Sequence, residues 1–328
     1  MKPLKNKVAV VAGATRGAGR GIARGLGEAG ATVYCTGRSV RGRPSPYKRS
    51  ETIEETADLV TAAGGTGIAV RVDHTAEAEV RRLFAQVEKD HGRLDVLVNS
   101  VAGEDPTLAW HEPLAKFDIE QGLALMRQAV FSHLLTARHA VPLMTRRRKG
   151  LIVEVTEGDT LMGSSSGWKS ILKVFAYLLA EELRKSRVAA VAVTPGYLRS
   201  ETMLEHFGVT ETNWREGGKK DPNFLESESP LLIGRAVAAL AADPKVLEHS
   251  GDVTSSWELA RRYGVVDEDG RCPDWSANWE KIAPAHRWLT EGFRREAEWL
   301  DRVARRAERY AGKPAAAKRA KCCGWAPA

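Results

Sequence analysis

The feature that most constrains the fold of this chain is a series of short apolar segments separated by stretches of helical character. The segments are Lys7–Ala12, Thr32–Thr36, Gly67–Val72, Leu94–Val98, Leu151–Val155 and Val188–Val193. Strands with so few polar side chains are typical of a parallel sheet that is covered by helices on both faces. Regular alternation of such strands with helices therefore predicts an α/β fold built on a doubly wound parallel sheet.

The stretches between these segments are expected to form helices. They are Arg20–Ala29, Glu51–Ala63, Glu77–Lys89, Glu120–Thr145 and Lys169–Lys185. Further along, Leu231–Ala242 is expected to be a helix, and Val253–Leu259 a last strand and turn. Tyr197–Pro230 is long and polar, which favours a substrate lid.

The chain divides into three predicted regions. Residues 1–265 are expected to form a dinucleotide-binding and catalytic domain, and residues 266–311 a C-terminal helical extension. The extension contains a charged amphipathic stretch, Ala285–Tyr310, whose polar face carries both Glu and Arg, which favours a protein contact over an anionic membrane surface. Residues 312–328 are rich in Ala, Lys, Pro and Cys, and a disordered basic tail is expected there.

A glycine-rich turn joins the first strand to the first helix. Residues 11–21 read Val-Ala-Gly-Ala-Thr-Arg-Gly-Ala-Gly-Arg-Gly. Glycine lets the backbone approach a pyrophosphate closely, and the helix that follows presents free N–H groups and a positive dipole end to that anion. The strand–turn–helix context predicts a dinucleotide site of Rossmann type. Its expected binding residues are Gly13, Thr15, Arg16, Gly17, Ala18 and Gly19.

The end of the second strand indicates which dinucleotide is bound. NAD-binding sites usually carry an acidic residue there, for the ribose 2′-hydroxyl. Here the sequence is Tyr-Cys-Thr-Gly-Arg, ending at Arg38, and a second arginine, Arg16, lies inside the glycine turn. Arginine forms bidentate, charge-assisted hydrogen bonds with phosphate. The pattern predicts NADP(H), bound through its 2′-phosphate by Arg16 and Arg38.

Composition excludes several other classes of function. The net charge is +7, but no nucleic-acid motif accompanies it, so an anionic cofactor is the simpler partner. No stretch approaches the ~18 consecutive apolar residues of a membrane span. The four cysteines show no metal-binding spacing and no disulfide framework. We expect a cytoplasmic protein without a metal, a nucleic-acid partner or a membrane span.

Four motifs in order identify a family. After the glycine turn come Asp73, the stretch Leu94-Asp95-Val96-Leu97-Val98-Asn99, and Thr194-Pro195-Gly196. Together they resemble the short-chain dehydrogenase/reductases, from about Lys5 to Asp252. Residues 237–264 resemble a subgroup of that family with an extended C-terminal end. The resemblance implies that Asp73 contacts adenine, that Asn99 lines the cofactor, and that Pro195 and Gly196 lie beside the nicotinamide. It also implies a homodimer or homotetramer.

The chain departs from the family at the catalytic Tyr-x-x-x-Lys signature. Alignment back from the sequence Ala-Glu-Glu-Leu-Arg at residues 180–184 places the lysine at Lys169 and a serine, Ser165, where the tyrosine belongs. The family's serine after the fifth strand is also displaced, and Thr156 is the nearest hydroxyl. A phenol can be tuned toward neutrality by a nearby ammonium group, whereas an aliphatic hydroxyl is a far weaker acid. Losing a positioned general acid costs on the order of 10²–10⁴-fold in rate.

Several side chains could replace the missing tyrosine. They are Glu157, Asp159, Tyr177, Tyr197 and His133. Tyr197 follows the Pro-Gly turn on the nicotinamide side, whereas Tyr177 lies about two helical turns beyond Lys169 and is expected to be too far away. His133 is expected to be a packed or surface residue rather than a catalyst.

These observations predict an NADP(H)-dependent oxidoreductase that acts on a carbonyl or alcohol of a small, partly apolar substrate. Lys169 would hold the nicotinamide ribose, Thr156 and Ser165 would bond the reacting oxygen, and Tyr197 is a further catalytic candidate. The missing tyrosine keeps two alternatives open. One is a protein that binds NADP(H) without redox turnover, as a sensor or partner subunit. The other is non-redox chemistry on the same fold, with Glu157 or Asp159 as the base.

Overall fold

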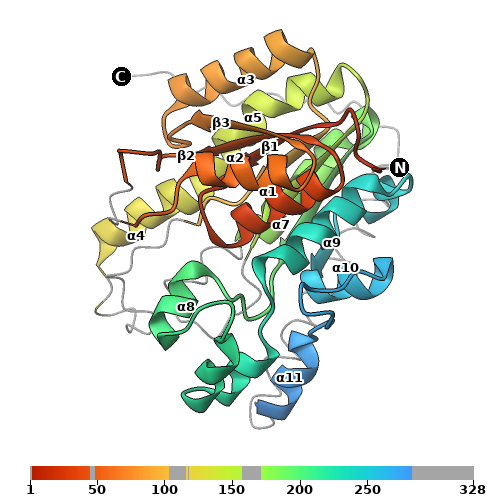
Figure 1. Ribbon diagram of the computed structural model, residues 1–328. Helices are drawn as coiled ribbons and strands as arrows, with labels where there is room; N and C mark the ends of the chain where they lie inside the picture. Colours follow the sequence, from red (N-terminus) through yellow and green to blue (C-terminus); the bar gives the residue numbers. More distant parts are fainter. Residues whose placement is uncertain (1, 45–48, 103–115, 117, 157–170, 283–328) are drawn as a thin grey trace, which may run out of the picture. The chain divides into compact units, whose positions relative to one another are not determined.

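The computed structural model describes residues 2–44, 49–102, 116, 118–156 and 171–282 (Figure 1). Met1–Ile282 form one compact unit. Among the described residues, seven strands make one sheet in the order β3-β2-β1-β4-β5-β6-β7, and each adjacent pair is parallel. The strands are β1 Val8–Ala12, β2 Thr32–Gly37, β3 Thr66–Arg71, β4 Val96–Asn99, β5 Gly150–Val155, β6 Val188–Thr194 and β7 Val253–Ser255. The predicted doubly wound parallel sheet is confirmed.

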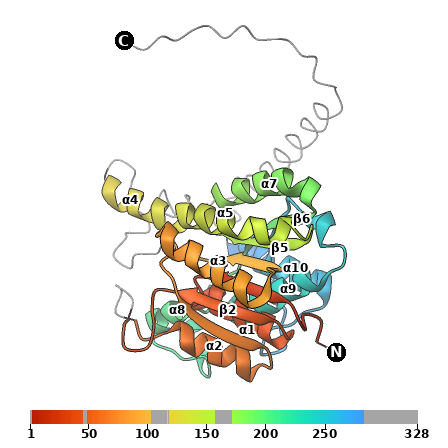
Figure 2. The ribbon, with the colours of Figure 1, turned by 90° about the horizontal axis from the view of Figure 1, so that it is seen from above.

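Helices cover both faces of this sheet. On one face lie α1 Gly17–Glu28, α2 Ile53–Ala62, α9 Pro230–Ala242 and α10 Ser256–Tyr263. On the other lie α3 Glu77–His91, α5 Ser132–Thr145 and α7 Ile171–Leu183. Figure 2 shows the sheet between α1 and α2 on one side and α3, α5 and α7 on the other.

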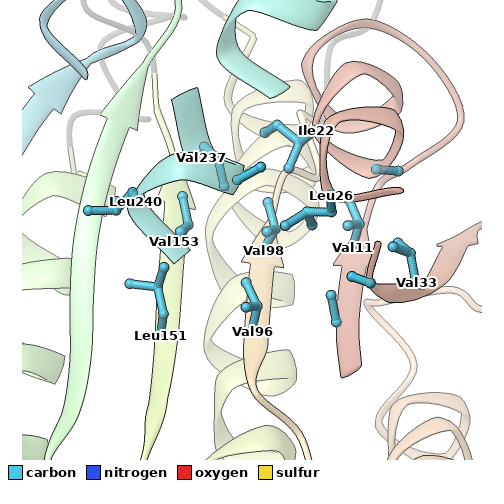
Figure 3. Close-up of a cluster of buried hydrophobic side chains, with 14 of the residues drawn as sticks. Val11, Ile22, Leu26, Val33, Val96, Val98, Leu151, Val153, Val237 and Leu240 are labelled. Atoms are coloured by element: carbon cyan, nitrogen blue, oxygen red, sulfur yellow. The ribbon is translucent and has the colours of Figure 1, made fainter. Parts of the chain in front are cut away.

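The core follows from the two-residue repeat of the strands. In β1, Val11 packs with the α1 and α9 side, whereas Val10 packs with the α3 and α5 side. Figure 3 shows Val11 and Val98 of adjacent strands among side chains that include Leu26 of α1. Burying an aliphatic side chain of this size stabilises a fold by about 1.5–3 kcal/mol, so a sheet buried on both faces needs apolar residues at nearly every position.

Helix caps explain where several elements begin. At α2, Thr52 and Glu55 form a reciprocal capping box, and Glu54 and Glu55 make the first turn acidic. At α10, Ser255 and Glu258 form a second box. The expectation of a strand and turn over Val253–Leu259 is therefore wrong beyond Ser255, because this box starts a helix directly at the end of the strand.

The long helix expected over Glu120–Thr145 is divided by a change of pitch. It consists of α4 Ile119–Met126, a π-helical turn Arg127–Phe131, and α5. A π turn has an i→i+5 hydrogen-bond pattern and often marks a functional site. The turn changes the angular phase between α4 and α5, and three polar side chains in the first part of α5 are buried. They are Ser132, His133 and Thr136.

The segment after β6 forms a small core of its own. It contains α8 Glu201–Phe207 and two 3₁₀ turns, Trp214–Lys219 and Pro222–Glu226, and α11 Trp275–Ile282 follows later in the chain. The core of this segment consists of Phe207, Trp214 and Phe224. Arg199, only 1% exposed, lies 4.1 Å from the Trp214 ring centre and donates to the Ser227 carbonyl at 2.7 Å. The stretch expected to act as a lid is thus an ordered, packed segment.

The membrane-span and C-terminal predictions concern the later part of the chain as well as its helices. No helix among the described residues is long and apolar enough to cross a membrane. The predicted helix Ala285–Tyr310 and tail 312–328 lie outside the described residues, as does most of the predicted extension 266–311. The part of the extension that is described includes Asp267, a buried side chain that accepts from the Ser229 amide at 2.8 Å.

Candidate functional site

Predicted site residues from five strands lie at the carboxyl edge of the sheet in the part of the chain that the structure describes. Gly13 follows β1, Arg38 follows β2, Asn99 ends β4, Thr156 follows β5 and Pro195 follows β6. The strand order reverses between β1 and β4, and ligands of open α/β sheets bind in the crevice outside the carboxyl ends at such a point. The topology therefore places side chains that are far apart in the sequence around one location.

The glycine turn is shaped by backbone contacts that leave no room for a side chain. Gly13 has φ +83°, and its amide donates to the Thr36 carbonyl at 3.0 Å. A Cβ at Gly13 would lie 2.6 Å from the Ser100 carbonyl oxygen, and one at Gly19 would lie 2.1 Å from the Gly13 carbonyl oxygen. Glycine is required at Gly13 both for its left-handed φ and for the close approach of two backbones.

The N-terminus of α1 already binds an anionic oxygen. The helix begins at Gly17 with no side-chain cap and no acidic residue in its first turn. The Gly17 amide donates instead to Oε2 of Glu201, on α8, at 2.7 Å, and Oε1 of the same carboxylate lies 3.6 Å from Nη1 of Arg20. Because a carboxylate oxygen fits this amide, the residues present suit the pyrophosphate of a dinucleotide.

Arg16 and Arg38 are half-buried beside the turn, and each lies near an acid. Burial raises the pKa of Asp73, but hydrogen bonds from Thr75 and the charge of Arg38 outweigh it and leave that pKa below its usual range. Burial likewise raises the pKa of Glu51, and Arg49 together with the charge of Arg16 lowers it overall. Arg38 therefore acts on the carboxyl group that follows β3, and Arg16 on the one that precedes α2.

Two other residues of the predicted cofactor set make well-defined contacts. Asp73 accepts from the Thr75 amide at 2.9 Å and from its hydroxyl at 2.7 Å, through Oδ1. Asn99 is completely buried, and its Nδ2 donates to Oε1 of Glu154 at 2.8 Å. Its Oδ1 has no hydrogen-bond partner among the described residues. The Asn99 side chain thus forms its hydrogen bond inside the protein, and its contribution to cofactor binding stays a prediction.

The Pro-Gly turn after β6 rests on a buried carboxyl group. A Cβ at Gly196 would lie 2.9 Å from Oε2 of Glu228, which also accepts from the Ser256 hydroxyl at 2.6 Å. Burial raises the pKa of Glu228 to about 8. Pro195, the other predicted residue of this turn, accepts from the Thr194 hydroxyl at 3.2 Å.

The catalytic candidates that the structure describes differ in their surroundings. Thr156 is buried at the end of β5, and its amide donates to the Val193 carbonyl at 2.9 Å. The Tyr197 hydroxyl donates to Asp221 at 3.3 Å, its ring packs on Phe224 and Trp275, and burial raises its pKa to about 12. The ring of Tyr177 lies 3.6 Å from the Cβ position of Gly251, which precedes β7, at the opposite edge of the sheet.

Four of the predicted catalytic candidates lie outside the described residues. They are Ser165, Lys169, Glu157 and Asp159. The next lysine along the chain, Lys173, is buried on α7.

A buried polar network behind the glycine turn was not anticipated. Glu154 of β5 is 0% exposed and His133 of α5 is 1% exposed, with Oε2 of the first 2.6 Å from Nδ1 of the second. Nε2 of His133 lies 3.1 Å from the Val101 carbonyl oxygen. His133 is therefore a packed residue, as expected. One sequence signal was available for the network: Glu154 is the single charged residue in an otherwise apolar strand, and a buried charge requires a partner.

Comparisons with known proteins agree with the fold. The family model for short chain dehydrogenases matches residues 7–207. The chain belongs to the short-chain dehydrogenase/reductase family. Over 282 residues it is 38% identical to dehydrogenase/reductase SDR family member 1 of Mus musculus, covering 82% of this chain and 85% of the mouse protein. The Homo sapiens protein of the same name is 35% identical over the same length and coverage.

A solved short-chain type dehydrogenase/reductase from Mycobacterium ulcerans has the same fold. Its TM-score is 0.63 at 22% identity, and the match covers 85% of this chain and 96% of the other. The predicted resemblance to short-chain dehydrogenase/reductases, and to the subgroup that includes dehydrogenase/reductase SDR family member 1, is confirmed. Members of this family are oxidoreductases that bind a nicotinamide dinucleotide and act on small molecules.

Proposed function

We propose that this short-chain dehydrogenase/reductase is an NADP(H)-dependent oxidoreductase acting on a carbonyl or alcohol of a small, partly apolar substrate. The observation that carries the choice of NADP(H) is the end of β2, where residues 34–38 include Arg38 and contain no carboxylate. A carboxylate there would bind the ribose 2′-hydroxyl of NAD and repel a 2′-phosphate. Arg38 and Arg16 instead offer two guanidinium groups to that phosphate.

Each group of the chain has a defined task in this proposal. The glycine turn and the Gly17 amide bind the pyrophosphate, and Asp73 lies on the adenine side. Lys169 holds the nicotinamide ribose, while Thr156 and Ser165 bond the reacting oxygen, with water as the proton source. Tyr197 is the second hydroxyl considered for this role. When bound, the nicotinamide supplies or accepts the hydride.

The experiment that tests the function measures hydride transfer directly. We expect the purified protein to oxidise NADPH with members of a broad panel of small carbonyl compounds, and to use NADH more slowly. We expect Ser165→Tyr to raise the rate on the order of 10²-fold, because it returns a tunable acid to the signature. Lys169→Ala is the matched loss variant. Tight NADPH binding without turnover, in both the wild type and Ser165→Tyr, would contradict the proposal.

That contrary result would favour the second candidate function. The observation behind it is Ser165 in place of the tyrosine, which leaves dinucleotide binding intact while removing the usual acid. The chain would then bind NADP(H) without turnover, as a sensor or partner subunit. Turnover of a substrate in the complete absence of NADP(H) would instead indicate non-redox chemistry with Glu157 or Asp159 as the base.

We also propose that the protein acts as a homo-oligomer, in the reducing environment of the cytoplasm. The described cysteines are unpaired thiols, Cys35 buried and Cys272 exposed. Assembly is supported by large apolar side chains exposed on two neighbouring helices of one face. They are Leu134 of α5, 48% exposed, and Ile171, Val174 and Leu178 of α7, the last 57% exposed.

A charge on this apolar surface is expected to weaken the assembly. Leu134→Asp with Leu178→Asp would raise the dissociation constant between copies by about tenfold or more, since a buried unpaired carboxylate is costly at an interface. Light scattering over a dilution series measures this. Leu59→Asp, on α2 at the opposite face of the sheet and 37% exposed, is the control and should leave the mass unchanged. Equal masses for all three proteins would disprove the predicted interface.

A further inference from the structure

Glu154 is a carboxyl group in the interior of the protein, where a charge needs partners. It lies in the middle of the parallel sheet and is completely buried. Both of its oxygens are bonded, Oε2 to Nδ1 of His133 at 2.6 Å and Oε1 to Nδ2 of Asn99 at 2.8 Å. Burying an isolated carboxylate is prohibitively costly, so the side chains around Glu154 must neutralise it or supply a proton.

The hydrogen bonds of His133 determine how many protons the pair holds. Nε2 faces the Val101 carbonyl at 3.1 Å, and a carbonyl can only accept, so Nε2 carries a hydrogen. The short contact between Nδ1 and Glu154 then contains one shared proton. Whether that proton resides on the ring or on the carboxyl group, the two side chains together are neutral.

The Val101 carbonyl links this pair to the glycine turn. Val101 and Ser100 follow β4, and the Ser100 amide donates to the Ala12 carbonyl at 2.9 Å. The Cβ position of Gly13 lies 2.6 Å from the Ser100 oxygen and 2.9 Å from the Val101 nitrogen. The peptide between Ser100 and Val101 is therefore the wall against which the glycine turn rests, and His133 holds the next peptide, between Val101 and Ala102, through its carbonyl.

A second connection runs from the same helix to the other side of the turn. Thr136 lies one helical turn after His133, and its hydroxyl is 2.9 Å from Nδ1 of His74. Nε2 of His74 is 2.8 Å from the hydroxyl of Thr36, whose carbonyl accepts the Gly13 amide. Burial and the nearby His133 lower the pKa of His74 to about 3, so the ring is neutral and bridges the two hydroxyls.

We propose that the His133–Glu154 pair is a positioning unit for the dinucleotide site, holding the wall of the glycine turn through the Val101 carbonyl. The proposal rests on the proposed function in that the turn binds NADP(H). Neither residue touches the cofactor. Both act from α5 and β5, and the parallel His74 connection from the same helix supports the other side of the turn.

The test compares three variants on one strand. Glu154→Ala removes the partner of His133, and we expect the dissociation constant for NADPH to rise about tenfold, as for other buried polar groups that lose a partner. Glu154→Gln can donate to Nδ1 and still accept from Asn99, so it should restore affinity to within about threefold of the wild type. Ile152→Ala, two residues earlier on the same face of β5, is the control for loss of packing.

Hydrogen exchange supplies a readout that does not depend on the cofactor. We expect the Gly13 and Ser100 amides to exchange faster in Glu154→Ala than in the wild type. They should not do so in Ile152→Ala, provided that the two variants have similar reductions in melting temperature. Unchanged exchange at these amides, or an equal rise of the NADPH dissociation constant in both variants, would overturn the positioning role. If Glu154→Ala does not fold, His133→Asn takes its place.

The two proposals can fail separately. If the wild type binds neither NADPH nor NADH, the proposed function fails. The exchange comparison still decides whether His133 and Glu154 hold the wall of the turn.

Discussion

Replacing Arg38 by glutamate is expected to reverse the preference of this protein between NADPH and NADH. The variant removes charge-assisted hydrogen bonds to the 2′-phosphate and places a carboxylate where the ribose 2′-hydroxyl of NADH can be bound. The dissociation constant for NADPH should rise on the order of 10²–10³-fold, because each hydrogen bond to a charged group is worth about 1.5–3 kcal/mol. The constant for NADH should stay level or fall.

Fluorescence titration of both dinucleotides measures this preference. The matched control is Arg41→Glu, three residues further on, whose guanidinium is 62% exposed and pairs with Asp58. It makes the same change in net charge away from the glycine turn, so it should alter both constants by less than about threefold. An unchanged NADPH constant in Arg38→Glu would refute the assignment of Arg38 to the 2′-phosphate.

Gly13→Ala is expected to be the most damaging single-methyl change in the glycine turn. The new Cβ would lie 2.6 Å from the Ser100 carbonyl oxygen, at a residue whose φ is +83°. Strain at a left-handed residue and overpacking against a backbone together should lower the free energy of unfolding by about 2–4 kcal/mol. Dinucleotide binding should be lost at the same time, since the turn can no longer rest against its wall.

Urea unfolding of Gly13→Ala and of a comparison variant, Gly42→Ala, separates backbone strain from overpacking. Gly42 has φ +76°, close to that of Gly13, but nothing lies within 4 Å of its Cβ position. Its substitution therefore reports strain alone, about 1 kcal/mol. If the free energy of unfolding falls by the same amount in both variants, the close approach between Gly13 and Ser100 does not contribute to the loss of stability.

The fold was largely predictable because its signals are local. Apolar segments such as Leu151–Val155 predict strands buried on both faces, and the structure has a strand at each predicted position. The errors came where local signals compete. The serine that closes β7 also caps α10, so the last strand stops sooner than the apolar pattern indicates. The π-helical turn before α5 leaves no mark in hydrophobic periodicity, which does not distinguish it from a continuous helix.

The site was predictable to the extent that its parts are adjacent in sequence. The glycine turn is one such unit, and its form could be predicted from the flanking strand and helix alone; its role in binding a dinucleotide stays a prediction. The contact between His133 and Glu154 joins residues of different elements, and the one between Gly17 and Glu201 spans 184 positions. No pattern of spacing encodes such pairs. A charged residue in an apolar strand, such as Glu154, indicates that a buried partner must exist, but it does not identify that partner.

The Glu201 contact has a consequence for the speed at which a dinucleotide is captured. In the proposed function, a pyrophosphate and the Glu201 carboxylate compete for the same Gly17 amide, and α8 is also held by Glu205, whose Oε2 lies 2.7 Å from Nη1 of Arg49. The Glu201 carboxylate must then leave the amide before the pyrophosphate binds there. The observed association rate should level off at high ligand concentration, at the rate with which the carboxylate leaves. The apparent affinity is lowered by the fraction of time that the carboxylate occupies the amide.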